Sequence, residues 1–387
     1  MRKVTKFKSL FNNNQAVKYS QPSLLLIFVL LALTACNFSR KNKTRNTVNQ
    51  FHKIEYSKQF GLIESDKTIQ LLNINKTDTL WSYTFEKTTK TPTIIVLSTV
   101  FAGFLELLKQ QSNIIGVDNF HFYSDSILIN QFNAKQTLEV GEESQLQLEK
   151  VLSLKPDIVI CNGANFIESA NGKRLEKMGI KVIYCDNFKE AHPLARAEWI
   201  KFFGALTGHL SLADSIFEQV KNNYNLIAFN SQKHREALLA QGKAAPKILS
   251  EAMFGDTWFV PGGGSYTAQL IEDAGGSYCF KSLQPLFTYP KSLENVLQEA
   301  KDADIWIHMN QFASRSEILQ ADTRYNLFKA FKTGQLFNNN KQENQYGGNA
   351  FWEYGVGRPD LILQDLYTIF KHPTAVNSGL NFYMKLN

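Results

Sequence analysis

The sequence predicts an α/β protein made of two lobes that are built alike and contain mostly parallel sheets. The first observation is a passage that occurs twice, at 148–152 with 156–160 and at 293–297 with 303–307. Each copy has the pattern of a short amphipathic helix, a turn with Asp and a buried strand. Strands also alternate with helices in both halves, and a long helical segment separates the halves.

The elements of the first half follow from this alternation. Short apolar runs predict buried strands at 93–97, 114–117, 157–161 and 180–184. Helical patterns lie between them at 101–111, 144–153 and 168–178. The preceding residues 37–90 are polar with alternating stretches such as 68–71 and 80–85, which predict a few antiparallel strands.

A helical segment from His192 to about Gln241 interrupts the alternation. Pro193 suits a first helical position, and apolar residues recur at helical spacing on both sides of Gly208. The second half then has a strand at 246–249, a helix at 265–274, the second copy of the passage and a closing helix at 359–370. We therefore expect two Rossmann-like lobes, 92–190 and 246–387, joined by a long rigid helix at 191–245, with a ligand cleft between the lobes.

The amino terminus predicts export. Basic residues precede an apolar run, 24–33, that ends in Leu33-Thr34-Ala35-Cys36. This run is short for a membrane span and is typical of a signal peptide covering residues 1–35. Leu-x-Ala-Cys looks like a bacterial lipobox, which implies acylation of Cys36 and a location in the periplasm or cell envelope as a membrane-anchored lipoprotein. The alternative is an uncleaved signal anchor. Residues 36–91 would form a lipid-anchored tether and a short β segment.

The distribution of charged residues bears on the class of ligand that the protein binds. Nine of the Lys and Arg residues lie in 1–50, which has no acid, so the remainder has 33 basic and 35 acidic residues. The folded part is therefore nearly neutral and gives no indication of nucleic-acid binding.

Cys161 and Cys185 each end an apolar run. They could form a disulfide, although a pair of buried free thiols is the favoured interpretation.

Candidate ligand-binding residues lie where strands end and loops begin, because ligands of open α/β sheets bind there. Most of these loops carry an aromatic residue together with an amide or acid. Aromatic side chains suit a large, flat or partly apolar ligand. The residues selected are Phe101, Tyr123, Asn162, Asn165, Trp258, Asn310, Trp352 and Tyr354.

Other chemistry is less well supported by the sequence. The seven His residues show no metal-ligand spacing, so no metal site and no cofactor is predicted, although His121 and His308 on opposing loops leave direct ligation open. Gly262-Gly263-Gly264 before Ser265 predicts a tight turn with a capped helix, the alternative being phosphate binding. No nucleophile motif is present, and no catalytic residue is assigned.

At this point the chain resembles a known family. The motifs are the lipobox Cys36, Leu97-Ser98 before a helix, 148–151 ahead of 155–160, the long helical segment, and Pro261-Gly262-Gly263 with Ala274-Gly275-Gly276. These are similar to the periplasmic binding proteins for iron–siderophore, haem and vitamin B12 uptake, over roughly 92–370. The resemblance implies a monomeric, non-enzymatic protein that delivers its ligand to an ABC permease. It also implies that Glu149 and Glu294 dock on that permease.

The expected ligand is an iron or cobalt chelate. Arg315, Arg324 and Arg358 are the second-lobe candidates for binding a trianionic catecholate, and they do not form a cluster in the sequence. The aromatic loops instead favour a bulky neutral or weakly charged chelate such as a corrinoid, a hydroxamate siderophore or haem. Two alternatives remain, namely an enzyme of chelatase-like fold and a protein that binds a transition metal directly.

Overall fold

The first lobe is built on a five-stranded sheet in the order β7-β6-β5-β8-β9, with every neighbouring pair parallel. Its strands are β5 (Ile94–Val96), β6 (Ile114–Val117), β7 (Leu138–Glu139), β8 (Ile158–Asn162) and β9 (Lys181–Cys185). The central strand β5 is fully buried, which explains its continuous apolar sequence. The computed structural model describes residues 50–387 apart from 76–77, 88–90, 163–169, 285–287 and 375–378.

Helices and short 3₁₀ turns connect these strands. The helices are α2 (Thr99–Leu107), α3 (Ser126–Asn133), α4 (Leu148–Leu154) and α6 (Ala170–Lys177). The 3₁₀ turns are η1 (Gln111–Asn113), η2 (Phe120–Phe122), η3 (Glu143–Gln145) and η4 (Asn187–Lys189). Cys161 and Cys185 are free and buried, and they belong to two separate groups of core residues. The two cysteines are therefore buried free thiols and do not form a disulfide.

The second lobe repeats this architecture with additions. Its main sheet has the order β13-β10-β15-β16-β17, in which only the last pair is antiparallel. The strands are β10 (Lys247–Ser250), β13 (Ser277–Tyr278), β15 (Ile305–Ile307), β16 (Leu336–Asn338) and β17 (Met384–Lys385). A smaller antiparallel sheet contains β11 (Met253–Phe254), β12 (Thr257–Pro261) and β14 (Thr288–Lys291).

The helices of the second lobe include both predicted and unpredicted elements. They are α10 (Tyr266–Asp273), α11 (Leu293–Ala300), α12 (Arg315–Ala321), α13 (Lys329–Thr333) and α14 (Pro359–Lys371), with η5 (Thr323–Leu327) and η6 (Gly355–Gly357). The repeated passage forms α4 followed by β8 in one lobe and α11 followed by β15 in the other. The prediction of two similarly built α/β lobes is therefore confirmed.

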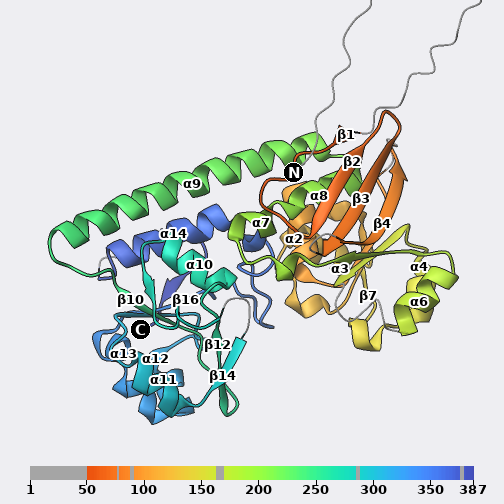
Figure 1. The fold of residues 1–387 in the computed structure, drawn as a ribbon. Coiled ribbons are helices and arrows are strands. Elements are labelled where there is room, and N and C mark those ends of the chain that lie inside the picture. Colours follow the sequence, from red (N-terminus) through yellow and green to blue (C-terminus); the bar gives the residue numbers. More distant parts are fainter. Residues whose placement is uncertain (1–49, 76–77, 88–90, 163–169, 285–287, 375–378) are drawn as a thin grey trace, which may run out of the picture. The chain divides into compact units, whose positions relative to one another are not determined.

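Three consecutive helices connect the lobes: α7 (Pro193–Ala197), α8 (Trp199–Thr207) and α9 (Leu210–Ala240). The left-handed Gly208 separates α8 from α9. The long helix α9, coloured green in Figure 1, packs against α8 and against α14 of the second lobe. No helix in the described part of the chain is both long and apolar enough to cross a membrane.

Residues before the first lobe form a separate antiparallel sheet in the order β1-β2-β3-β4. Its strands are β1 (Gln50–Phe51), β2 (Phe60–Glu64), β3 (Thr68–Asn75) and β4 (Asp78–Glu86), drawn in orange in Figure 1. Phe60 of β2 packs against Trp199 and Phe202 of α8. The sheet therefore shares a hydrophobic core with the helical segment. The predicted signal peptide and Cys36 lie outside the described residues.

Candidate functional site

The loops that follow the parallel strands define the candidate site. The carboxyl ends of parallel strands meet at one edge of a sheet, where open α/β proteins bind their ligands. In the first lobe, η2 follows β6 and η4 follows β9. In the second lobe, the β11–β12 hairpin follows β10, and a long loop, 339–354, follows β16. We call these four segments the edge loops.

Exposed aromatic side chains are concentrated on the edge loops. Trp352 has 43% of its surface exposed and Phe254 has 72%. The set comprises Phe122 on η2, Phe188 on η4, Phe254 and Phe259 on the hairpin, and Tyr346 and Trp352 on the loop after β16. Exposing large aromatic groups is unfavourable in water, so their placement on loops at the carboxyl edges of both sheets makes these loops a candidate binding surface. Both lobes contribute aromatic side chains to this set.

Three of the individual residues selected from the sequence lie in the core instead. Phe101 is fully buried with its ring 5.8 Å from that of Phe203. Tyr123 is also buried and donates its hydroxyl to Asp118 at 2.6 Å. Trp258 stacks on Trp306 at 5.5 Å, and its indole N–H donates to the carbonyl oxygen of Ser250. These three side chains therefore face the protein core and not the solvent.

The burial of Phe101, Tyr123 and Trp258 has local causes. Tyr123 is adjacent to the exposed Phe122, and Trp258 is adjacent to the exposed Phe259. In β12 successive side chains point to opposite faces, so only one of Trp258 and Phe259 can reach solvent. Phe122 instead ends the 3₁₀ turn η2, and the hydrogen bond from Tyr123 to Asp118 holds the Tyr123 side chain in the core. In α2, Phe101 instead faces the helical segment because the helix packs against α8 on that side.

The remaining selected residues lie nearer the surface. Asn162 ends β8, and its backbone N–H donates to the Glu143 carboxylate at 2.7 Å. The Asn310 amide donates to the carbonyl oxygens of Ala252 and Met253, so it connects the loop after β15 to the segment after β10. Trp352 is exposed, and Tyr354 lines a pocket described below. Asn165 lies outside the described residues.

Edge loops from the two lobes contact each other directly. The Glu353 carboxylate accepts a hydrogen bond from the backbone N–H of Ser124 at 2.6 Å and another from the Ser124 hydroxyl. The Asn344 amide donates to the carbonyl oxygens of His121 and Tyr123 at 3.0 and 2.9 Å. The rings of His121 and Tyr346 lie 4.3 Å apart. We call this set of contacts the lobe junction.

A pocket of about 570 Å³ adjoins the lobe junction. Its lining comes from both lobes and includes Glu106, Ser124, Asp125, Glu343, Asn344 and Tyr354. None of the described residues lining it is Lys or Arg. Burial, together with the negative charges of Asp125 and Glu353, raises the pKa of Glu106 to about 8. Burial likewise raises the pKa of Glu353 to about 7, although hydrogen bonds from Ser124 oppose the shift.

The raised pKa values of Glu106 and Glu353 predict that the stability of the folded protein falls as the pH rises. Their folded-state pKa values lie above the ordinary value of 4.5, so the folded protein binds more protons than the unfolded chain. The stability that these two carboxyl groups contribute is complete below about pH 4.5. It is lost as the pH rises through about 7 for Glu353 and about 8 for Glu106. Urea midpoints should therefore decrease between pH 5 and pH 8. In Glu353→Gln, where the amide oxygen still accepts from Ser124, the decrease should be smaller; an unchanged slope would contradict the assignment.

Direct metal ligation receives no support from the described residues. No group of three or more His, Cys, Asp or Glu side chains in this part of the chain could hold a metal ion. His308 is 3% exposed, with its Nε2 2.5 Å from the Tyr383 hydroxyl, whereas His121 is exposed beside Tyr346. The two imidazoles therefore have different environments. Ser265 caps α10 by accepting from the N–H of Ala268, as the Gly-rich turn predicted.

The two candidate docking glutamates occupy equivalent positions. Glu149 lies in the first turn of α4 and Glu294 in the first turn of α11, and both are exposed. Hydrogen bonds from its own backbone N–H and from Ser292, together with the charge of Arg324, lower the pKa of Glu294. Arg324 also forms an ion pair with Glu294. In the isolated protein this carboxylate is thus already paired with a cation.

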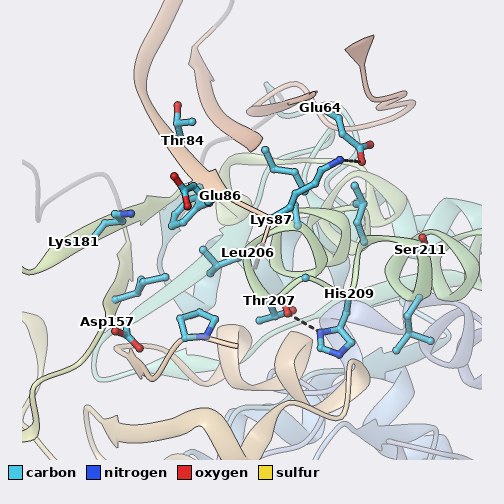
Figure 2. Close-up of a pocket in the computed structure, with 18 residues that line it drawn as sticks. Glu64, Thr84, Glu86, Lys87, Asp157, Lys181, Leu206, Thr207, His209 and Ser211 are labelled. Carbon is cyan, nitrogen blue, oxygen red and sulfur yellow. Dashed lines mark hydrogen bonds and ion pairs between the residues drawn. The ribbon is translucent and has the colours of Figure 1, made fainter. Parts of the chain in front are cut away.

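A second pocket, of about 930 Å³, lies away from the edge loops (Figure 2). It is lined by β4, by the first residues of β8 and β9, and by the junction of α8 with α9. An ion pair between Lys87 and Glu64 lies at its border, and the His209 imidazole donates to the carbonyl oxygen of Thr207 at 2.8 Å. Because it adjoins the amino ends of β8 and β9, this pocket is separate from the candidate site.

Two α/β lobes joined by a helical segment, with aromatic loops at the carboxyl edges of both sheets, define a two-lobed solute-binding protein. The periplasmic binding protein family matches residues 94–342. The chain therefore belongs to that family, as its sequence motifs predicted. Members are extracytoplasmic, bind a small-molecule solute and work with ABC permeases.

Individual proteins are also similar to this chain. An uncharacterized lipoprotein of Methanocaldococcus jannaschii is 25% identical over 309 residues, which cover 76% of this chain and 68% of that protein. A periplasmic haem-binding protein of Pseudomonas aeruginosa has a similar structure, with a TM-score of 0.55, 19% identity and coverage of 76% and 98%. The haem complex of Staphylococcus aureus IsdE gives a TM-score of 0.51, 17% identity and coverage of 73% and 99%. The structural matches establish the fold.

Proposed function

We propose that this protein captures a metal chelate with a flat or bulky, largely apolar surface and delivers it to an ABC permease. Haem, a corrinoid and a hydroxamate siderophore are the candidate ligands. The observation that carries the proposal is the set of six exposed aromatic side chains on edge loops of both lobes. Aromatic rings bury large areas against a planar ligand and lose little conformational entropy. Two of the similar structures are those of a haem-binding protein and of a haem complex.

The arginines argue against a trianionic catecholate. Arg315 donates to the carbonyl oxygen of Phe331 and lies over its ring. Arg324 pairs with Asp322 and Glu294, and Arg358 pairs with Asp360. Each guanidinium therefore already has partners within the second lobe, and these arginines do not form the cationic cluster that three negative charges would require.

Thermal shift with haemin, cyanocobalamin, ferrichrome and a ferric catecholate tests this proposal. A cognate chelate at a hundredfold excess over Kd should stabilise the protein by about 2.7 kcal/mol. Trp352→Ala should weaken binding about tenfold, because buried aromatic contacts dominate binding energy. Phe229→Ala, which removes an aromatic side chain that is 56% exposed on α9, should not.

The other candidate functions give different results in the same experiment. Stabilisation by free Zn²⁺ or Mn²⁺ and by none of the chelates would contradict the proposal and favour direct metal binding. Chemical conversion of the chelate on incubation would instead identify an enzyme, since a binding protein returns its ligand unchanged.

We further propose that Glu149 and Glu294 dock the loaded protein on the permease. Two carboxylates on separate lobes can pair with two basic sites, which sets the register and the rate of association. Reversing both charges, Glu149→Lys with Glu294→Lys, should abolish uptake and leave chelate affinity unchanged. Glu299→Lys on the same helix α11 is the control and should transport normally. A loss of chelate affinity in the double variant would show that these residues line the ligand site instead.

The proposed location is the outer surface of a membrane, with a lipid on Cys36 as the anchor. The signal-like residues 1–35 and the lipobox-like motif support this assignment. Cys36→Ser should move the protein from the membrane fraction to the soluble fraction, and retention in the membrane fraction would contradict lipid anchoring.

A further inference from the structure

Three buried carboxylates lie between the end of β9 and the start of α8, namely Asp186, Glu190 and Glu198. Buried carboxylates require hydrogen-bond donors, because an unpaired buried charge is strongly unfavourable. All three receive donors from residues 55–73, which precede the region that matches the periplasmic binding protein family. The amino-terminal sheet and the connection between β1 and β2 thus supply hydrogen-bond donors to all three acids.

The contacts with Glu190 connect the amino-terminal segment to an edge loop. The Glu190 carboxylate accepts from the Ser57 hydroxyl at 2.5 Å and from the backbone N–H groups of Lys58 and Gln59 at 3.0 and 3.1 Å. Asp186 accepts from the Asn73 amide at 3.1 Å. These two acids directly flank η4, so donors from β3 and from the connection between β1 and β2 hold both of its ends.

The same edge loop is connected to the second lobe. Arg196 of α7 donates to the carbonyl oxygens of Glu190 and Phe188 at 2.8 and 3.0 Å. Its guanidinium lies over the ring of Tyr266, the first residue of α10, at 4.2 Å. A continuous set of contacts therefore leads from Ser57 through Glu190 and Arg196 to the second lobe.

We propose that Ser57 and Glu190 are positioning residues, through which the amino-terminal sheet holds η4 and its exposed Phe188 in place for the ligand. This inference rests on the proposed function of the edge loops. Phe188 has few constraints of its own, since its side chain is exposed. Its backbone is held by Arg196 and by the anchored acids on either side. The sheet thereby contributes to the ligand-binding surface without contacting the ligand.

Amide hydrogen exchange of the full chain without ligand tests the positioning. The N–H groups of Lys189 and Glu190 bond to the carbonyl oxygens of Asp186 and Asn187, so both are reporters. Ser57→Ala should speed their exchange about tenfold, the effect of losing one hydrogen bond to a charged group. The control is Ser65→Ala, which removes a hydroxyl that caps the β2–β3 turn of the same sheet. It should leave η4 at the wild-type rate.

Haemin titration of the same variants, or titration with whichever chelate stabilises the wild type, tests the consequence for binding. Ser57→Ala should weaken affinity several-fold, and Ser65→Ala should not. Unchanged exchange at η4 in Ser57→Ala, or an equal increase throughout the protein, would overturn the inference. Faster exchange with unchanged affinity would overturn it as well. If no chelate binds the wild type, the proposed function fails, whereas the exchange result still decides the positioning.

Discussion

Glu198→Ala is expected to lower the free energy of unfolding by about 3–5 kcal/mol, the usual effect of breaking a buried ion pair. The Glu198 carboxylate is fully buried and accepts from the backbone N–H groups of residues 55–57 at 2.7–2.9 Å. It also pairs with Lys201 at 3.1 Å. Removing it leaves that buried ammonium with the Lys53 carbonyl oxygen at 3.2 Å and Asp214 at 3.8 Å, and leaves three N–H groups without their acceptor.

Urea denaturation monitored by circular dichroism measures this loss. Glu218→Ala is the matched control, because Glu218 forms an ion pair with Lys221 at the same sequence spacing but is exposed. Its loss should be under about 1 kcal/mol, as for other surface pairs. Equal effects of the two substitutions would show that the amino-terminal segment is not held by Glu198.

Gly103→Ala is expected to destabilise the lobe junction by about 1–3 kcal/mol through overpacking. A Cβ atom at Gly103 of α2 would lie 2.2 Å from the carbonyl oxygen of Glu353 and 2.6 Å from its carbonyl carbon. These are backbone atoms of the second lobe, so they cannot rotate away, and α2 must move relative to the loop 350–357. Alanine is a better helix former by about 1 kcal/mol, which offsets only part of the loss.

Urea midpoints measure the change in stability, and small-angle X-ray scattering measures any separation of the lobes. Gly61→Ala in β2 is the control, since its Cβ would meet the ends of the Ile74 and Leu72 side chains at 3.2 and 3.5 Å and the Leu72 Cβ atom at 3.8 Å, with no backbone atom among its three nearest contacts. Those side chains can rotate, so we expect no comparable loss. A Gly103→Ala protein as stable as the wild type, with unchanged scattering, would mean that the lobe junction does not form in solution.

Much of the fold was predictable because its elements depend on local patterns. The apolar run at 93–97 contains β5 and the helical spacing after Pro193 contains α7 and α8. The periodicity of side chains is a property of a short segment, so no knowledge of distant residues is needed. The β11–β12–β14 sheet was missed, since its short strands contain Pro261 and Pro290 and lack a clear apolar alternation.

The candidate site was predictable only as a set of loops. The sequence indicates where strands end, and aromatic residues are abundant there. It does not reveal that Phe122 and Phe259 face solvent whereas Tyr123 and Trp258 are buried. Which of two neighbouring side chains is buried depends on what packs against it, and the partners of Trp258 include the distant Trp306 and Phe328.

The sequence by itself determined the α/β alternation, the repeated helix–turn–strand unit and the family, because each depends on a local order of residues. The tertiary structure decided which acids are buried and what they bind. Glu190 and Glu198 have no distinguishing sequence pattern, yet they bind a segment more than a hundred residues earlier in the chain. A carboxylate is buried only where donors converge on it, and those donors come together only when the chain has folded.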